Sequence, residues 1–214
     1  MGRRMLLFGG TFDPVHHGHL IAARAICERG GYGRVVLVPA ARPPHKAPAA
    51  ASRAQRLAML RLAAGDDATF VVDDIELRRD GPSYTYDTLA ALRDAHDGVE
   101  LHWVIGADML EDLPEWHRVD DVLDMARIVV AVRPPWTERI EALLDRLRDE
   151  LDPARVDRLA ASVVQTPQIE ISSREIRDRL ARARSIRYLV PEPVRACIMQ
   201  EGLYTDARGE TGEK

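Results

Sequence analysis

The sequence contains only two cysteines, Cys27 and Cys197, and neither stands in a spacing typical of a metal site or a redox pair. It also has no apolar run long enough to cross a membrane and no N-terminal pattern of a secretory signal. We therefore expect a soluble, cytoplasmic protein with no membrane partner, in which both cysteines are small core residues of a reducing compartment.

Lysine is scarce as well. Arginine supplies 28 of the 30 basic residues, and the two lysines are Lys46 and Lys214. The net charge of -4 excludes broad nucleic-acid binding, which needs a basic surface, but it leaves small polyanions as ligands. Lys214 ends a polar tail, residues 205–214, that we expect to be disordered. Lys46 is then the only lysine of the folded body, either by chance or because a compact ammonium is needed there.

Apolar runs rich in β-formers alternate with helical patterns along the whole chain. We predict strands at residues 5–8, 34–40, 69–77, 100–108, 127–135 and 163–172. We predict helices at residues 19–29, 53–64, 83–96, 137–151, 173–183 and 192–203. Strands separated by helical crossovers predict a single doubly wound, Rossmann-like α/β domain over residues 1–204, with a mainly parallel sheet and helices on both faces.

Ligands of such sheets bind beyond the carboxyl ends of the strands. Polar segments follow three of the predicted strands: "GGTFDPVHHGHL" at residues 9–20, "PPHK" at 43–46 and "GAD" at 106–108. We expect these three segments to converge on one edge of the sheet.

The first segment carries three histidines where a strand leads into a helix. His16 is expected at the mouth of that helix and His19 in its first turn, with Gly18 between them to let a ligand approach the backbone. Free N–H groups and the helix dipole make the mouth an anion site. Further amides come from Gly9, Gly10 and Thr11.

Zinc is the rival interpretation of three histidines. A zinc site usually has three or four nitrogen or sulfur ligands, yet no cysteine is near and His17 should point away from His16 and His19. We therefore expect no metal held by the protein itself, and a Mg²⁺ ion bound mainly through substrate phosphates.

The first segment resembles the signature of the nucleotidyltransferase superfamily, a His-x-Gly-His motif after the first strand. "ISSREIR", residues 171–177, resembles the second signature of that group, although Arg174 stands where threonine is common. A capped surface helix would explain this second segment alone. Paired with the first segment, its helix mouth and Arg177 indicate a second phosphate site.

The resemblance implies adenylyl transfer from ATP, with Mg²⁺, to a phosphorylated acceptor. Charge on the reacting phosphates would be neutralised by His16, His19, Lys46 and Arg177. The protonation of the two histidines is not readable from the sequence. The residues implied in ATP binding are Gly9, Gly10, Thr11, Phe12, Gly18, Gly106, Asp108, Arg133, Ser172 and Ser173.

The chain resembles the bacterial nicotinate-nucleotide adenylyltransferases along nearly its whole length. The order and spacing of "PPHK", "SYTYDTL", "IGAD", "PEW" and "SIRYLVPEPV" carry this resemblance. It implies nicotinate mononucleotide as acceptor, with Thr85 and Trp116 on the pyridine ring and its carboxylate and with His117 beside Trp116. Asp13, inside the first segment, is expected to orient a backbone group or the acceptor. Alternatively, Trp116 is a lid over a helix end and Thr85 is a helix N-cap.

Two other functions stay open. One is a related transferase that uses nicotinamide mononucleotide or phosphopantetheine, and the other is a nucleotide-binding sensor without turnover. The small-molecule substrates are the only partners that the sequence indicates, and a homo-oligomer is compatible with it.

Overall fold

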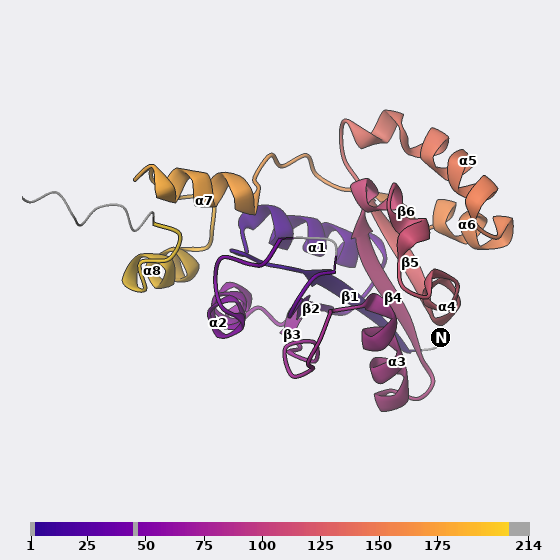
Figure 1. Cartoon of the computed structure of the whole chain (residues 1–214), viewed down its shortest axis with the longest axis horizontal. Coiled ribbons are helices and arrows are strands. Elements are labelled where there is room, and N and C mark those ends of the chain that lie inside the picture. The colour runs from indigo at the N-terminus through magenta and orange to yellow at the C-terminus, as the bar shows by residue number, and fades with distance from the viewer. Residues whose placement is uncertain (1–2, 45–46, 206–214) are drawn as a thin grey trace, which may run out of the picture.

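The computed structural model describes residues 3–44 and 47–205, and its strands form one parallel sheet in the order β3-β2-β1-β4-β5-β6 (Figure 1). The strands are β1 (Arg3–Gly10), β2 (Val35–Pro39), β3 (Phe70–Val72), β4 (Val99–Gly106), β5 (Ala126–Val132) and β6 (Val163–Gln165). The predicted doubly wound α/β fold with a parallel sheet is confirmed.

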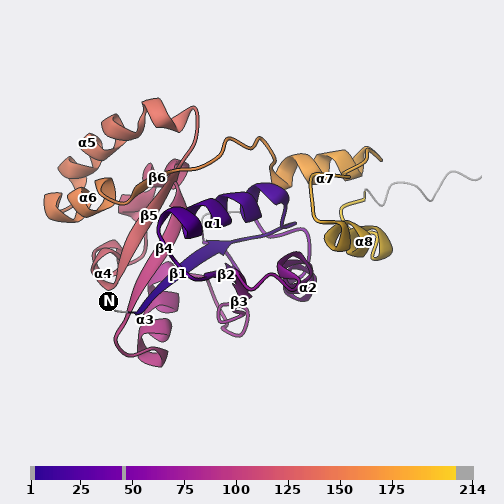
Figure 2. The same ribbon diagram turned by 180° about the vertical axis from the view of Figure 1, so that it is seen from behind.

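In the described residues, eight α-helices cover the two faces of this sheet. They are α1 (His17–Arg29), α2 (Arg53–Ala64), α3 (Thr85–Ala95), α4 (Val119–Met125), α5 (Ile140–Glu150), α6 (Pro153–Ala160), α7 (Ser173–Ala181) and α8 (Glu192–Gln200). Short 3₁₀ turns are η1 (Ala107–Leu110), η2 (Leu113–Glu115) and η3 (Trp136–Glu138). Figures 1 and 2 show α5 and α6 at one end of the molecule and α7 and α8 at the other.

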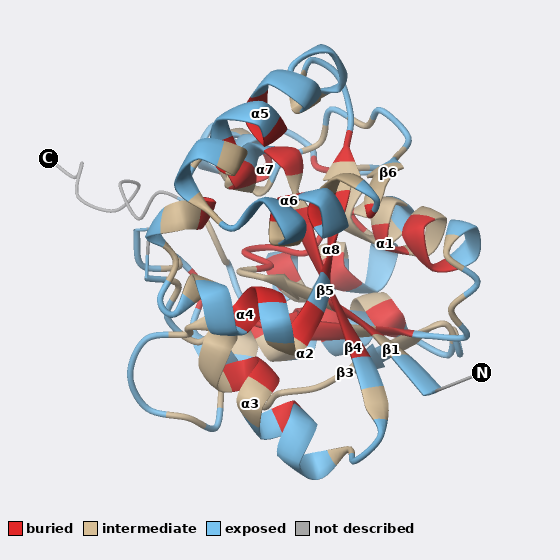
Figure 3. Ribbon diagram, turned by 90° about the vertical axis from the view of Figure 1, so that its right-hand side faces the viewer, coloured by how far each residue is buried: buried red, intermediate tan, exposed pale blue. Residues whose placement is uncertain are grey.

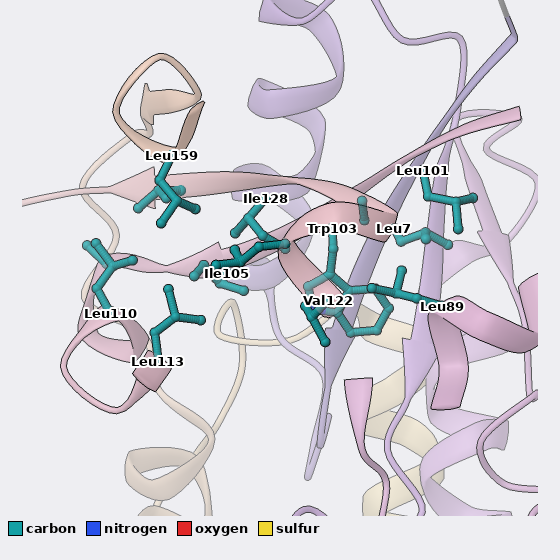
Figure 4. Packing of buried hydrophobic residues seen from close by; sticks show 14 of the residues in the cluster. Leu7, Leu89, Leu101, Trp103, Ile105, Leu110, Leu113, Val122, Ile128 and Leu159 are labelled. Atoms are coloured by element: carbon teal, nitrogen blue, oxygen red, sulfur yellow. The ribbon is translucent and has the colours of Figure 1, made fainter. Parts of the chain in front are cut away.

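The hydrophobic core is split by the sheet into two layers. One layer joins α3, α4, α5 and α6 to the sheet, and the other joins α1, α2, α7 and α8 to its opposite face. In the first layer Trp103 lies close to Leu7, Leu89 and Val122 (Figure 4). Burial is concentrated along the central strands (Figure 3), as expected where helices cover both faces of a parallel sheet.

Several element boundaries differ from the sequence prediction. Strand β3 has only three residues, and so does β6, because both lie at the edges of the sheet and pair with a single neighbour. Helices α4 and α6 were not predicted. The predicted cap of α2 is confirmed, since the Ser52 hydroxyl accepts a hydrogen bond from the Gln55 N–H at 3.2 Å.

The order of the strands fixes where a ligand can reach the backbone. The chain moves outward from β1 to β3 on one side and from β4 to β6 on the other, so the direction of winding reverses between β1 and β4. Loops diverge at such a switch point and leave a crevice at the carboxyl ends of the strands. Among the described helices, none is both long and apolar enough to span a membrane.

Close packing at this switch point explains one of the paired glycines. A Cβ on Gly9 would lie 2.4 Å from Cζ2 of Trp103, the side chain at the centre of the first core layer. Glycine at this position therefore lets β1 and the Trp103 ring approach each other.

We expect Gly9→Ala to lower the free energy of unfolding by about 1–3 kcal/mol, because the indole must shift inside a packed core. Urea unfolding should show a lower midpoint at an unchanged slope. Gly33→Ala is the matched control, since a Cβ there meets no atom within 4 Å. An equal stability of the Gly9 and Gly33 variants would contradict this account.

Candidate active site

The carboxyl ends of β1, β2 and β4 border an open pocket with a cavity volume of about 140 Å³. It is lined by Gly9, Gly10, Thr11, Ala40, Pro43, Pro44, Glu76, Ser83, Tyr84, Thr85, Trp103, Val104, Met109, Trp116 and His117. The loops after β1 and β2 and the segment after β4 thus converge as predicted. Lys46, the predicted catalytic lysine, lies outside the described residues.

A stacked pair of imidazoles stands at the start of α1. His16 is the N-cap residue and His19 lies in the first turn, and their ring centroids are 3.7 Å apart at an interplanar angle of 24°. The N–H of His16 donates to Nδ1 of His19 at 3.3 Å. Phe12 is buried, and its ring packs edge-on against His19 at 5.1 Å. Phe12, a predicted ATP contact, thus also supports the His19 ring.

His16 is buried, and this decides its charge. Burial is the largest cause that lowers the pKa of His16 to about 4, and the positive charges of Arg133 and His17 contribute to the same shift. Near neutral pH the His16 side chain is therefore uncharged and can only donate or accept a hydrogen bond. His16 is one of the four residues predicted to neutralise the charge of the phosphates, and in this structure it is not itself positively charged.

Gly18 is packed against its surroundings. A Cβ at this position would lie 3.0 Å from Nδ1 of His16 and 3.4 Å from the carbonyl oxygen of Ile171. The absence of a side chain lets the His16 ring and the second motif close onto the first turn of α1. The sequence predicts that Gly18 lets a ligand approach the backbone. The structure shows that close packing is a second reason for a glycine at this position.

The two motifs, more than 150 residues apart, form one unit. The Ser173 hydroxyl donates to the carbonyl oxygen of Pro14 at 2.8 Å, and Nη1 of Arg177 donates to that of Asp13 at 2.6 Å. Ser172 caps α7, since its hydroxyl accepts a hydrogen bond from the Glu175 N–H at 3.1 Å. The mouths of α1 and α7 are thereby held side by side.

Arg133 extends this cationic edge from the end of β5. Its Nη1 donates to the carbonyl oxygen of Ile169 at 2.6 Å, in the segment that leads into the second motif. Its positive charge is one of the causes that lower the pKa of His16. Both Arg133 and Arg177 keep part of their surface exposed. Two guanidinium groups therefore flank the helix mouths.

Asp13 orients backbone groups, the first of its two predicted roles. It is buried, does not line the pocket, and accepts backbone hydrogen bonds from Ala50 at 2.7 Å and Ala51 at 3.0 Å. The Tyr204 hydroxyl donates a third at 2.8 Å. Both carboxylate oxygens are thus bonded within the protein, so Asp13 anchors the loop before α2 in place of contacting an acceptor.

The predicted acceptor residues gather in the pocket. Thr85 is the first residue of α3, whereas the N-cap is Tyr84, so the alternative of Thr85 as N-cap is wrong. Trp116 follows η2, and the exposed His117 ring lies 4.5 Å from the Tyr84 ring at an interplanar angle of 32°. Indole and phenol rings around an open space suit a flat aromatic ligand.

Gly106 and Asp108 lie at the end of β4, beside this pocket. A Cβ on Gly106 would lie 2.3 Å from Oδ1 of Asp108, so the glycine lets the carboxylate fold back over the strand end. Asp108 is exposed and belongs to η1. Both residues lie at the predicted edge of the sheet.

Two buried charged residues at the site were missed. Glu76 lines the pocket and accepts a hydrogen bond from the Thr88 hydroxyl at 2.7 Å, and burial raises the pKa of its carboxyl. Arg56 in α2 donates to the carbonyl oxygens of Thr11 and Ala40, both at 2.7 Å. Both look like ordinary surface charges in the sequence, because nothing in their neighbourhood reveals the backbone groups they meet.

Comparison with known proteins places the chain among its relatives. Residues 7–179 match the family described as cytidylyltransferase-like. A protein of Thermomicrobium roseum named probable nicotinate-nucleotide adenylyltransferase is 41% identical over 94% of this chain and 91% of its own length. One of the same name from Aeromonas salmonicida is 43% identical over 92% of this chain and 95% of its own. The chain belongs to the nicotinate-nucleotide adenylyltransferase family.

The fold agrees with this membership. The solved structure of Plasmodium falciparum nicotinic acid mononucleotide adenylyltransferase complexed with NaAD superposes with a TM-score of 0.72 at 16% identity, covering 94% of this chain and 97% of that one. The described residues of this adenylyltransferase contain no group of three or more His, Cys, Asp or Glu side chains that could hold a metal ion.

The depressed pKa of His16 predicts an acid-sensitive fold. Between pH 6.5, its ordinary pKa, and about 4, the unfolded chain binds more protons at this residue than the folded chain does. From pH 7.5 to 5.5 the wild type should therefore lose about 1.4 kcal/mol more unfolding free energy than His16→Gln. Urea unfolding at both pH values measures this difference.

His96→Gln, at the end of α3, controls for the loss of a histidine elsewhere. A wild type and a His16→Gln variant that lose equal stability on acidification would show that His16 charges freely in the folded state.

Proposed function

We propose that the chain transfers the adenylyl group of ATP to nicotinate mononucleotide and releases pyrophosphate. The product is nicotinate adenine dinucleotide, the deamido precursor in NAD biosynthesis. The observation that carries this proposal is the junction of two helix mouths, made by the contacts of Ser173 and Arg177 with the loop after β1. Two adjacent anion sites suit a triphosphate and a phosphorylated acceptor. Relatives that carry this activity in their name match the chain over nearly its full length.

The reaction needs no covalent intermediate on the protein. An oxygen of the acceptor's phosphate attacks the α-phosphorus of ATP. The bond from that phosphorus to the oxygen shared with the β-phosphorus breaks, and this oxygen leaves with pyrophosphate. Catalysis then rests on placing the two phosphates in line and on offsetting the charge that builds on the leaving group.

The charged and the neutral side chains of the site contribute to catalysis in different ways. Arg177 and Arg133 supply permanent positive charge, and Lys46 is proposed to add a third cation. His16 is neutral near pH 7, so it contributes a hydrogen bond, and with Phe12 it holds His19 at the helix mouth. The amides of Gly9, Gly10 and Thr11, the helix mouth at Gly18, and Ser172 and Ser173 complete the proposed phosphate contacts, with Gly106 and Asp108 on the adenosine half.

Mg²⁺ is proposed to enter as part of the substrate. The described residues offer no cage of protein ligands, and Mg²⁺ is commonly held by substrate phosphates and water. The ion would thus arrive on the ATP phosphates, next to the mouths of α1 and α7.

The acceptor's pyridine ring is proposed to lie in the pocket beside Trp116. The indole offers a flat face, and Thr85 at the start of α3 offers a helix N-terminus for a carboxylate. His117 stands next to Trp116 at the rim. These contacts favour a ligand that combines an aromatic ring with a negative charge.

Pyrophosphate release from ATP and Mg²⁺ tests the reaction. We expect turnover with nicotinate mononucleotide to exceed that with nicotinamide mononucleotide and with phosphopantetheine. His19→Ala should lower kcat by a hundredfold or more, about the loss that follows removal of a preorganised group at a reacting phosphate.

His17→Ala is the matched control, because the contact of His17 with the Leu189 carbonyl comes from its backbone N–H and survives the substitution. Preferred turnover of another acceptor would refute the assignment of the acceptor. ATP binding without turnover of any acceptor would indicate a nucleotide sensor.

Trp116→Leu tests the acceptor pocket. Losing the stacking surface should raise the KM for nicotinate mononucleotide about tenfold and leave the KM for ATP within about twofold. Steady-state kinetics with each substrate varied in turn separate the two constants. Trp136→Leu, on η3, is the control. Equal KM values for the acceptor in the wild type and in Trp116→Leu would remove Trp116 from the pocket's function.

A further inference from the structure

The carboxylate of Asp13 is the meeting point of four segments that are distant in sequence. It accepts the N–H groups of Ala50 and Ala51 and the hydroxyl of Tyr204. Nη1 of Arg177 lies 3.7 Å from its Oδ2 while donating to the Asp13 carbonyl. A buried carboxylate with several hydrogen-bond donors is a rigid anchor, because each donor left unpaired would cost free energy.

Tyr204 reaches this anchor from the C-terminal end of the described chain. After α8 the backbone turns back through Gly202 and Tyr204, both with positive φ, at 59° and 64°. The N–H of Leu203 donates to the Ile198 carbonyl and closes this turn. A positive φ at a tyrosine is unfavourable, so its surroundings must hold it there. The hydrogen bond to Asp13 is the polar contact at its tip.

The tyrosine hydroxyl is the donor in this hydrogen bond. Burial raises the pKa of Tyr204, and the negative charge of Asp13 and the hydrogen bond to it raise that pKa as well. Tyr204 therefore keeps its proton, and Asp13 stays the acceptor. Burial lowers the pKa of the nearby Arg56 guanidinium, and the negative charge of Asp13 partly opposes this shift.

The groups that Asp13 holds belong to the proposed site. Its carbonyl oxygen fixes one nitrogen of Arg177, and its side chain fixes the backbone at residues 50–51, where the loop after β2 enters α2. Removing the Tyr204 hydroxyl leaves Oδ1 with one donor, the Ala51 N–H. The carboxylate can then rotate away from Arg177.

We propose that Tyr204 is a positioning residue for the adenylyl transfer, acting through Asp13 on Arg177. The inference rests on the proposed function, because it gives Arg177 its task at the reacting phosphates. Tyr204 itself touches neither substrate in this scheme. It links the last turn of the chain to the loop after β1.

Tyr204→Phe removes only the hydroxyl. We expect kcat to fall about tenfold, with both KM values within about twofold, because a misplaced charge acts on the transition state more than on binding. Tyr32→Phe is the matched control, since that hydroxyl is also partly buried and lies 2.6 Å from Nδ1 of His102. Its kcat should stay at the wild-type value even if both variants lose similar stability.

A double-mutant cycle separates positioning from structural support. If Tyr204 acts through Arg177, Tyr204→Phe combined with Arg177→Ala should have the same kcat as Arg177→Ala alone. Multiplying effects, or a Tyr204→Phe kcat within twofold of wild type, would overturn the proposal. The cycle is run with whichever acceptor the wild type turns over, so a wrong acceptor leaves its outcome readable.

Hydrogen exchange gives a result that needs no turnover. The amides of Ala50 and Ala51 should exchange about tenfold faster in Tyr204→Phe than in the wild type, and at the wild-type rate in Tyr32→Phe. Unchanged exchange at both amides would overturn the proposal even in a chain that proved to be a nucleotide sensor.

Discussion

The loop after β1 runs through the interior, and its backbone must find hydrogen-bond partners there. Residues 12–16 are all buried, yet they form neither helix nor strand up to the start of α1. Buried carbonyl groups without partners are rarely tolerated. Here Arg56 donates to the carbonyl of Thr11 and Arg177 to that of Asp13. The donors come from α2 and α7, so the shape of this loop depends on both helices.

The need for these hydrogen-bond partners links the stability of the loop after β1 to the proposed chemistry of the site. The same arginine that satisfies a buried carbonyl also presents the rest of its guanidinium at the mouth of α1. The imidazole pair follows a similar logic, because burial keeps His16 neutral while its stacking orients His19. Positive charge at the proposed reaction centre therefore comes from guanidinium groups, and orientation comes from groups without charge.

The sequence predicted the elements that show a regular hydrophobic period. It missed the features that depend on contacts between residues far apart in the chain. Alternating strands and helices gave the parallel sheet, and the two motifs marked the helix mouths. Helix α6 has its own local signals, an Asp152 cap and Pro153 in the first turn. It follows so closely on the helical pattern of α5 that the sequence does not show it as a separate helix. The roles of Arg56 and Tyr204 depend on backbone atoms and a carboxylate far along the chain, which no local spacing records.

The site is divided between the two ends of the chain, and this has a consequence for synthesis on the ribosome. The six strands of the described chain are complete once Gln165 has been made, so the sheet can assemble while a later segment is still in the exit tunnel. The loop after β1 then still lacks the donors of α7 and the tyrosine that follows α8. At a synthesis rate of roughly 5–20 residues per second, that interval lasts only seconds. Within it the nascent chain has its sheet, while α7 and Tyr204 have not yet joined the loop after β1, so the proposed site is assembled after the sheet.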